Sequence, residues 1–89
     1  MEELVERAKK NDEQAFDEII LMMEKEMYLV ARSKLNNDDD ISDAIQETII
    51  ICFKNIIKLK DNSLFKTWII RILINECNKI YKKKKKNII

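Results

Sequence analysis

The sequence predicts an all-α domain, a compact bundle of four helices, and two observations lead to that prediction. The 89 residues contain no glycine and no proline, whereas the tight turns of β-hairpins depend on residues that tolerate positive φ. Apolar residues instead recur at three- and four-residue steps, which is the spacing of a buried helix face. Frequent isoleucine alone would favour strands, but burial outweighs propensity. We therefore expect a single domain over residues 1–89 with no strand.

The first half of the chain predicts two helices. A short apolar pattern from Leu4 to Ala8 indicates a first helix that stops near Asn11. Asp12 can cap the second helix, because a side-chain carboxylate accepts the free backbone N–H groups at a helix start. The second helix then runs to about Leu35.

Two further helices are predicted in the second half. Residues 36–40, Asn-Asn-Asp-Asp-Asp, form a polar connector whose carboxylates favour the positive end of the next helix. The third helix covers Ile41–Ile56, and residues 58–63 form the next loop. Ser63 is the expected cap of the fourth helix, which starts near Phe65.

The apolar faces of the three longer helices define a predicted core. Its members are Phe16, Ile19, Met23, Ile45, Ile49, Phe53, Ile69, Ile72 and Leu73. Cys52 and Cys77 fall on the same faces, without CxxC spacing and in a chain that contains no histidine. We therefore expect no zinc site, no disulfide and no cofactor.

Charge divides the chain into an acidic half and a basic half. Residues 1–48 hold 6 Lys or Arg and 14 Asp or Glu, a net of −8, and residues 49–89 hold 11 and 2, a net of +9. Such a split favours two partners, with a polyanion at the basic end. The longest apolar runs are far too short to span a bilayer and no signal peptide opens the chain, so we expect no membrane partner and a cytoplasmic location.

A stripe on the third helix lies outside the core face, and we call it the acidic stripe. Its members, at i, i+3, i+4, i+7 and i+11, are Asp43, Gln46, Glu47, Ile50 and Lys54. An amide flanked by carboxylates beside an exposed isoleucine suits docking against a basic, helical partner surface. A solvated face without a partner is the alternative. Catalysis is not indicated, because no nucleophile or histidine accompanies the carboxylates.

An outward stripe on the fourth helix, the basic stripe, mixes guanidinium, carboxamide and ammonium groups. Its members are Arg71, Asn75, Asn78, Lys79 and Lys82. Arg and Lys neutralise phosphates, and Asn can pair with an adenine edge. A plain solvated face, the alternative, would more often carry Glu among its lysines, and only Glu76 interrupts this one. The stripe therefore indicates nucleic-acid binding.

The start of the fourth helix adds further candidates. Lys66 and Thr67 lie where free N–H groups and the helix dipole attract phosphate. Trp68, at the edge of the apolar face, is either a core residue or a ring that stacks on an unpaired base. The preceding loop consists of Lys60, Asp61, Asn62 and Ser63. Taken alone, these residues indicate only a turn. Beside an aromatic residue and a basic helix, the loop could hold an extruded base.

Two stretches taken together resemble a known family. DAIQETIIICFKNI (residues 43–56), followed by KDNSLFKTWIIRILINECNKIYKKK (residues 60–84), is similar to region 2 of bacterial RNA polymerase sigma factors. The greatest similarity is to the extracytoplasmic-function (ECF) group. The opening LVERAKKNDEQAFDEII resembles the start of those proteins, so the resemblance covers nearly the whole chain.

The resemblance implies a role in transcription initiation. The family's Asp-x-x-Gln-Glu motif binds the clamp helices of the largest polymerase subunit, which implies this role for Asp43, Gln46 and Glu47, with Ile50 beside them. The family's loop and fourth helix melt and read the −10 promoter element and hold a flipped non-template base. This implies DNA contacts by residues 60–63, by the basic stripe and by the early helix residues that include Trp68. An inhibitory anti-sigma factor is a further partner that the resemblance admits.

The sequence also departs from the family pattern. Lys60 stands where the family loop often has Gly, and Phe53 stands where Trp is common, a conservative exchange in a core. Residues 82–89 read as a basic tail, an added helical turn or the start of a linker. The helix-turn-helix domain that reads the −35 element, region 4, is absent from this sequence, so we expect a domain from a longer protein. The alternative function is a small helical protein-interaction module with this fold and no promoter recognition.

Overall fold

The computed structural model describes the backbone of residues 1–87 and the side chains of residues 1–85. Its helices are α1 (Glu2–Lys9), α2 (Glu13–Lys34), α3 (Asp38–Asn55) and α4 (Phe65–Asn87). Two short 3₁₀ turns, Ile56–Lys58 and Asn62–Leu64, lie in the connection between α3 and α4. The described residues contain no strand, which confirms the predicted all-α class. The predicted extension of the fourth helix is also confirmed, whereas Ile88–Ile89 of the predicted tail lie outside the described residues.

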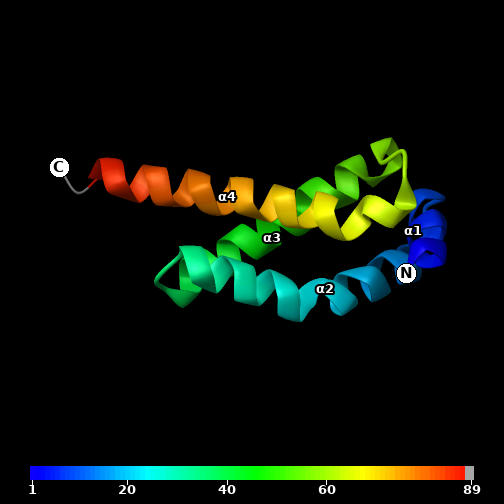
Figure 1. The fold of residues 1–89 in the computed structure, drawn as a ribbon, viewed down its shortest axis with the longest axis horizontal. Coiled ribbons are helices and arrows are strands. Elements are labelled where there is room, and N and C mark those ends of the chain that lie inside the picture. Colours follow the sequence, from blue (N-terminus) through cyan, green and yellow to red (C-terminus); the bar gives the residue numbers. More distant parts are fainter. Residues whose placement is uncertain (88–89) are drawn as a thin grey trace.

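The three long helices run side by side, each in the direction opposite to the one before (Figure 1). α1 lies at one end of this bundle, beside the connection between α3 and α4. At the other end α4 extends past the turn between α2 and α3, which gives the molecule its elongated shape of 47 × 22 × 19 Å. The residues of the predicted base-holding loop are therefore next to the N-terminal helix.

Local side-chain chemistry sets the helix starts. The Asp12 carboxylate accepts the Ala15 N–H at 3.1 Å, so α2 is capped as predicted. Asn11 before it has φ 69°, a left-handed conformation that asparagine tolerates better than most residues. α3 begins earlier than expected, because the Asn37 side chain accepts the Asp40 N–H at 2.8 Å. The three aspartates therefore form the first turn of α3 and are not a connector.

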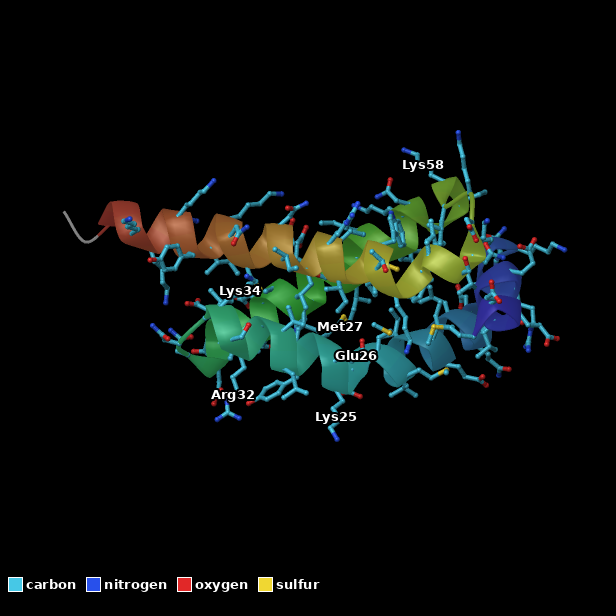
Figure 2. All side chains as sticks on the ribbon, viewed as in Figure 1. Lys25, Glu26, Met27, Arg32, Lys34 and Lys58 are labelled. Atoms are coloured by element: carbon cyan, nitrogen blue, oxygen red, sulfur yellow. The ribbon has the colours of Figure 1, made fainter. Side chains whose placement is uncertain are left out.

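The core forms where the apolar faces of all four helices meet. Five of the predicted core residues are buried, namely Phe16, Ile19, Met23, Ile69 and Leu73. Three others, Ile45, Ile49 and Ile72, are only partly buried. Figure 2 shows the alternation along α2, where Met27 points into the space between the helices and Lys25 and Arg32 point away from them.

Phe53 was wrongly predicted to be a core residue, since its side chain is 57% exposed. Four residues turn an α-helix by a full turn plus about 40°. Along the series Ile45, Ile49 and Phe53, each step therefore rotates the side chain further from the core. Phe53 instead covers the outer edge of Phe16, with ring centroids 5.2 Å apart in a T-shaped arrangement.

Candidate functional site

The acidic stripe lies on the solvent-facing side of α3. Each of its residues is exposed, while the opposite side of the helix buries Ile41, Ala44 and Thr48. Among the described side chains, Asp43, Glu47 and Lys54 have no partner in an ion pair. The stripe therefore presents its charges to solvent, and α3 does not need them for packing within the domain.

A groove between α2 and α3 opens beside this stripe. Its lining residues are Leu21, Glu24, Lys25, Tyr28, Asp38, Ile41, Ser42, Ile45 and Gln46. Gln46 thus belongs both to the groove and to the acidic stripe. Sequence reasoning missed Leu21 and Tyr28, which are large and exposed. Both residues fall outside the buried face of α2, and large apolar residues grouped on an exposed face are typical of interaction surfaces. This pattern could have identified them from the sequence.

The loop before α4 is an internally hydrogen-bonded turn. One Asp61 oxygen, Oδ1, accepts the Ser63 N–H at 3.0 Å and the Ser63 hydroxyl at 2.6 Å. These hydrogen bonds, the side-chain one first, lower the pKa of the Asp61 carboxyl, so it is ionised at neutral pH. The predicted role of Ser63 as the cap of α4 is wrong, because Asp61 caps the 3₁₀ turn that precedes the helix. Lys60 is exposed beside this turn.

Asn62 points back to α1. Its Oδ1 accepts from Lys9 Nζ at 2.9 Å, and its Nδ2 donates to Glu6 Oε2 at 2.8 Å. Lys9 also donates to the backbone carbonyl of Leu59. The Asn62 hydrogen bond lowers the pKa of the Glu6 carboxyl more than the nearby lysines do. Both the oxygen and the nitrogen of the Asn62 amide are therefore hydrogen-bonded in this structure.

The turn that leads into α4 satisfies its own N–H groups, and the predicted phosphate-binding residues Lys66 and Thr67 follow it. The N–H groups of Ser63, Leu64 and Phe65 donate within the loop and the 3₁₀ turn, so they are not offered to an anion. Lys66 is exposed and pairs with Glu26 at 3.7 Å. Thr67 is exposed.

Trp68 lies at the edge of the core, as the sequence predicted. It packs partly buried against the core, with its ring centroid 6.0 Å from that of Phe65 at a tilt of 47°. The remaining ring surface is accessible. Trp68 follows Lys66 and Thr67 on the first turn of α4, so it lies close to the loop in sequence.

The basic stripe lies on the exposed side of α4, and each of its members is exposed. Glu76, expected to interrupt it, is instead buried on the inner side of the helix. Its carboxylate Oε2 lies 3.0 Å from Nζ of Lys79, a member of the stripe. The exposed side therefore carries no acidic residue among its members, although Glu76 offsets part of the charge of Lys79 from below.

The two cysteines lie in the core of the domain. Both cysteines are buried and free, and burial raises the pKa of the Cys52 thiol to about 12, which keeps it protonated and unreactive. Residues 1–85 contain no group of three or more His, Cys, Asp or Glu side chains that could hold a metal ion. None of the described helices is long and apolar enough to cross a membrane.

Comparison with known proteins gives a consistent set of similarities. Residues 20–87 match the family model described as Sigma-70 region 2. The chain is 32% identical over 81 residues to the ECF RNA polymerase sigma factor SigW of Bacillus subtilis, which covers 90% of this chain and 43% of SigW. It is 29% identical over 72 residues to the ECF RNA polymerase sigma-E factor of Escherichia coli K12, which covers 81% of this chain and 37% of that protein.

A solved structure has the same fold. An engineered region 2 of sigmaE in complex with GTAAAA superposes with a TM-score of 0.86 at 23% identity, covering 97% of this chain and 90% of the other. The chain spans less than half the length of the curated relatives it matches.

Proposed function

Because this chain belongs to the sigma-70 region 2 family, we propose that it is a transcription initiation module of the ECF type. It binds the RNA polymerase core and recognises and melts the −10 promoter element, and it acts in the cytoplasm by binding and not as an enzyme. One observation carries the proposal. An exposed acidic stripe on α3 and an exposed basic stripe on α4 occupy adjacent helices, and the connection between these helices contains the 60–63 loop.

The polymerase contact is assigned to the acidic stripe, through Asp43, Gln46, Glu47 and Ile50. Their exposure and the lack of ion pairs for the carboxylates within the described domain leave them available to the clamp helices of the largest subunit. The adjoining apolar groove supports this assignment, because a docking site needs apolar area inside a polar rim. Leu21 and Tyr28 extend the contact onto α2.

The DNA contact is assigned to the 60–63 loop, Trp68 and the basic stripe. Melting a base-pair step costs about 1.4 kcal/mol, and stacking of an extruded base on an aromatic ring returns about 1–3 kcal/mol. The accessible part of Trp68 offers such a ring, while Arg71 and Lys82 offer charge for phosphates. Asp61, held ionised beside Ser63, offers a carboxylate oxygen to a base amino group.

The polymerase contact is tested by Glu47→Lys, with Glu3→Lys on α1 as the matched control. Both variants make the same charge change at an exposed glutamate. We expect Glu47→Lys to weaken binding to core polymerase at least about tenfold, because like charges then face each other. The free energy of unfolding should change by no more than about 0.5 kcal/mol. Unaltered binding, or an unfolded Glu47→Lys domain, would contradict the assignment.

The DNA contact is tested with the single strand GTAAAA, the sequence bound by the engineered sigmaE region 2. Fluorescence anisotropy should show tighter binding of GTAAAA than of a scrambled strand, with and without core polymerase, at several salt concentrations. A basic helix binds any DNA weakly, so the ratio of the two affinities is the informative quantity. Equal affinities would favour the alternative function, a helical module that binds only protein through the α2–α3 groove.

A further inference from the structure

The N-terminal helix is joined to the base-holding loop by a network of charged and polar groups. Lys9 of α1 donates to the carbonyl of Leu59, the residue before the loop, and to the Oδ1 of Asn62 within the loop, 2.9 Å away. Glu6, one turn earlier on α1, accepts the Asn62 Nδ2–H at 2.8 Å. The three side chains thus connect segments more than fifty residues apart in the sequence.

This network fixes the orientation of the Asn62 carboxamide. The oxygen of the amide faces an ammonium group and its nitrogen faces a carboxylate, and hydrogen bonds to ionised groups are stronger than those between neutral ones. A flip of the amide would place NH₂ against the lysine and oxygen against the glutamate, so both contacts would become repulsive. Asn62 can therefore not turn freely toward a ligand while α1 holds it.

We propose that Glu6 and Lys9 are positioning residues for promoter recognition, and that Asn62 anchors the loop and does not read a base. The loop residues on either side of the anchor, Asp61 and Ser63, are exposed and hydrogen-bonded to each other in a defined turn. Holding Leu59 and Asn62 keeps this turn in one position before DNA arrives. The inference rests on the proposed function, and α1 lies outside residues 20–87 that match the family model.

The effect should be separable from the packing of α1. Val5 and Ala8 attach the helix to the core, whereas Glu6 is exposed and contributes no buried apolar area. Losing its carboxylate should leave the domain folded but give the loop more conformations. A loop that samples several positions loses discrimination between bases, because part of the binding energy is spent on ordering it. Sequence-independent binding by the basic stripe should not change.

The experiment compares variants of the 89-residue chain for binding to GTAAAA, to GTAAAA with single base substitutions and to a scrambled strand. We expect Glu6→Ala and Lys9→Met to reduce the preference for GTAAAA several-fold while leaving the affinity for the scrambled strand unchanged. Glu6→Gln should keep most of the preference, because its amide oxygen still accepts from Asn62. The matched controls Glu3→Ala and Lys10→Met change the same charges at exposed positions of the same chain segment.

NMR of the Asn62 side-chain amide gives a readout that does not need DNA. Its protons should exchange with solvent more slowly in the wild type and in Glu6→Gln than in Glu6→Ala, while the Asn78 side-chain amide stays the same in all variants. Unchanged Asn62 exchange, or undiminished preference for GTAAAA in both Glu6→Ala and Lys9→Met, would overturn the inference. A wild-type chain that binds all strands equally would instead overturn the proposed function. The role of Glu6 and Lys9 in base preference would then be overturned too, whereas the anchoring of Asn62 would still be tested by its amide exchange.

Discussion

At the scale of single residues, two isoleucines at opposite extremes of exposure test which positions belong to the core. Ile69 on α4 is fully buried, whereas Ile57 in the 3₁₀ turn after α3 is 69% exposed. Replacing Ile69 with alanine should lower the free energy of unfolding by about 2–5 kcal/mol, through lost burial and the cavity that remains. The same replacement at Ile57 should change it by no more than about 0.5 kcal/mol.

Urea unfolding followed by far-UV circular dichroism measures both variants on one scale. A small effect of Ile69→Ala would mean that α4 does not bury this face, and a large effect of Ile57→Ala would mean that the connection between α3 and α4 is part of the core. Phe53→Ala should lower the free energy of unfolding by an amount between those of the two isoleucine variants. Phe53 is largely exposed, yet it covers the edge of Phe16.

At the scale of a helix, α4 places two lysines of the basic stripe in different environments, although the sequence predicts the same role for both. Lys79 lies 3.0 Å from the carboxylate of Glu76, whose side chain is only 10% exposed. Lys82 is exposed and has no ion-pair partner among the described side chains. The two lysines should therefore differ in their contribution to stability while sharing a contribution to DNA binding.

We expect Lys79→Ala to destabilise the domain by up to about 1 kcal/mol, because the largely covered Glu76 side chain loses its ion-pair partner. Lys82→Ala should leave stability unchanged and lower the salt slope of single-strand binding by about 0.7 for one lost phosphate contact. Thermal unfolding and anisotropy titrations at several salt concentrations measure the two effects. Equal stabilities of the two variants would show that Glu76 does not depend on Lys79, and an unchanged slope for Lys82→Ala would remove it from the DNA contact.

At the scale of the whole molecule, the acidic and basic halves of the sequence are joined by ion pairs across helices. Lys66 pairs with Glu26 of α2 at 3.7 Å, and Lys84 pairs with Asp40 of α3 at 2.6 Å. The second pair is the more protected, since the Asp40 side chain is 15% exposed. It holds the last turns of α4 against the start of α3, at the end of the molecule where α4 extends beyond its neighbours (Figure 1).

Asp40→Asn should loosen this end of α4 without unfolding the domain. We expect amide hydrogen exchange of residues 81–85 to accelerate several-fold, because those turns lose their charged contact with α3. Global stability should fall by no more than about 1 kcal/mol, as is usual for a pair near the surface. Asp39→Asn, an exposed neighbour in the same helical turn, should leave the exchange unchanged. If both variants behave alike, net charge and not the pair controls the end of α4.

The sequence by itself determined the features that depend on neighbouring residues. Helical periodicity and the absence of glycine and proline predicted four helices and no strand, and Asp12 marked the start of α2. The same periodicity placed the acidic and basic stripes on exposed helix faces, because a helix turns by a constant angle per residue. The residues that carry the family resemblance lie within these segments, so membership of the family could also be predicted from the sequence.

Only the tertiary structure determined which residues at the edges of the helix faces are buried, and which residues the loop contacts. Phe53 is exposed and Glu76 is buried because the neighbouring helices cover only part of each face, and their positions are not encoded in spacing along one helix. The attachment of Asn62 to Glu6 joins residues 56 positions apart, and no local pattern predicts such a contact. The chain's charges and helices are therefore local properties, whereas the position of the candidate DNA-binding loop depends on the contacts of α1 with the connection between α3 and α4.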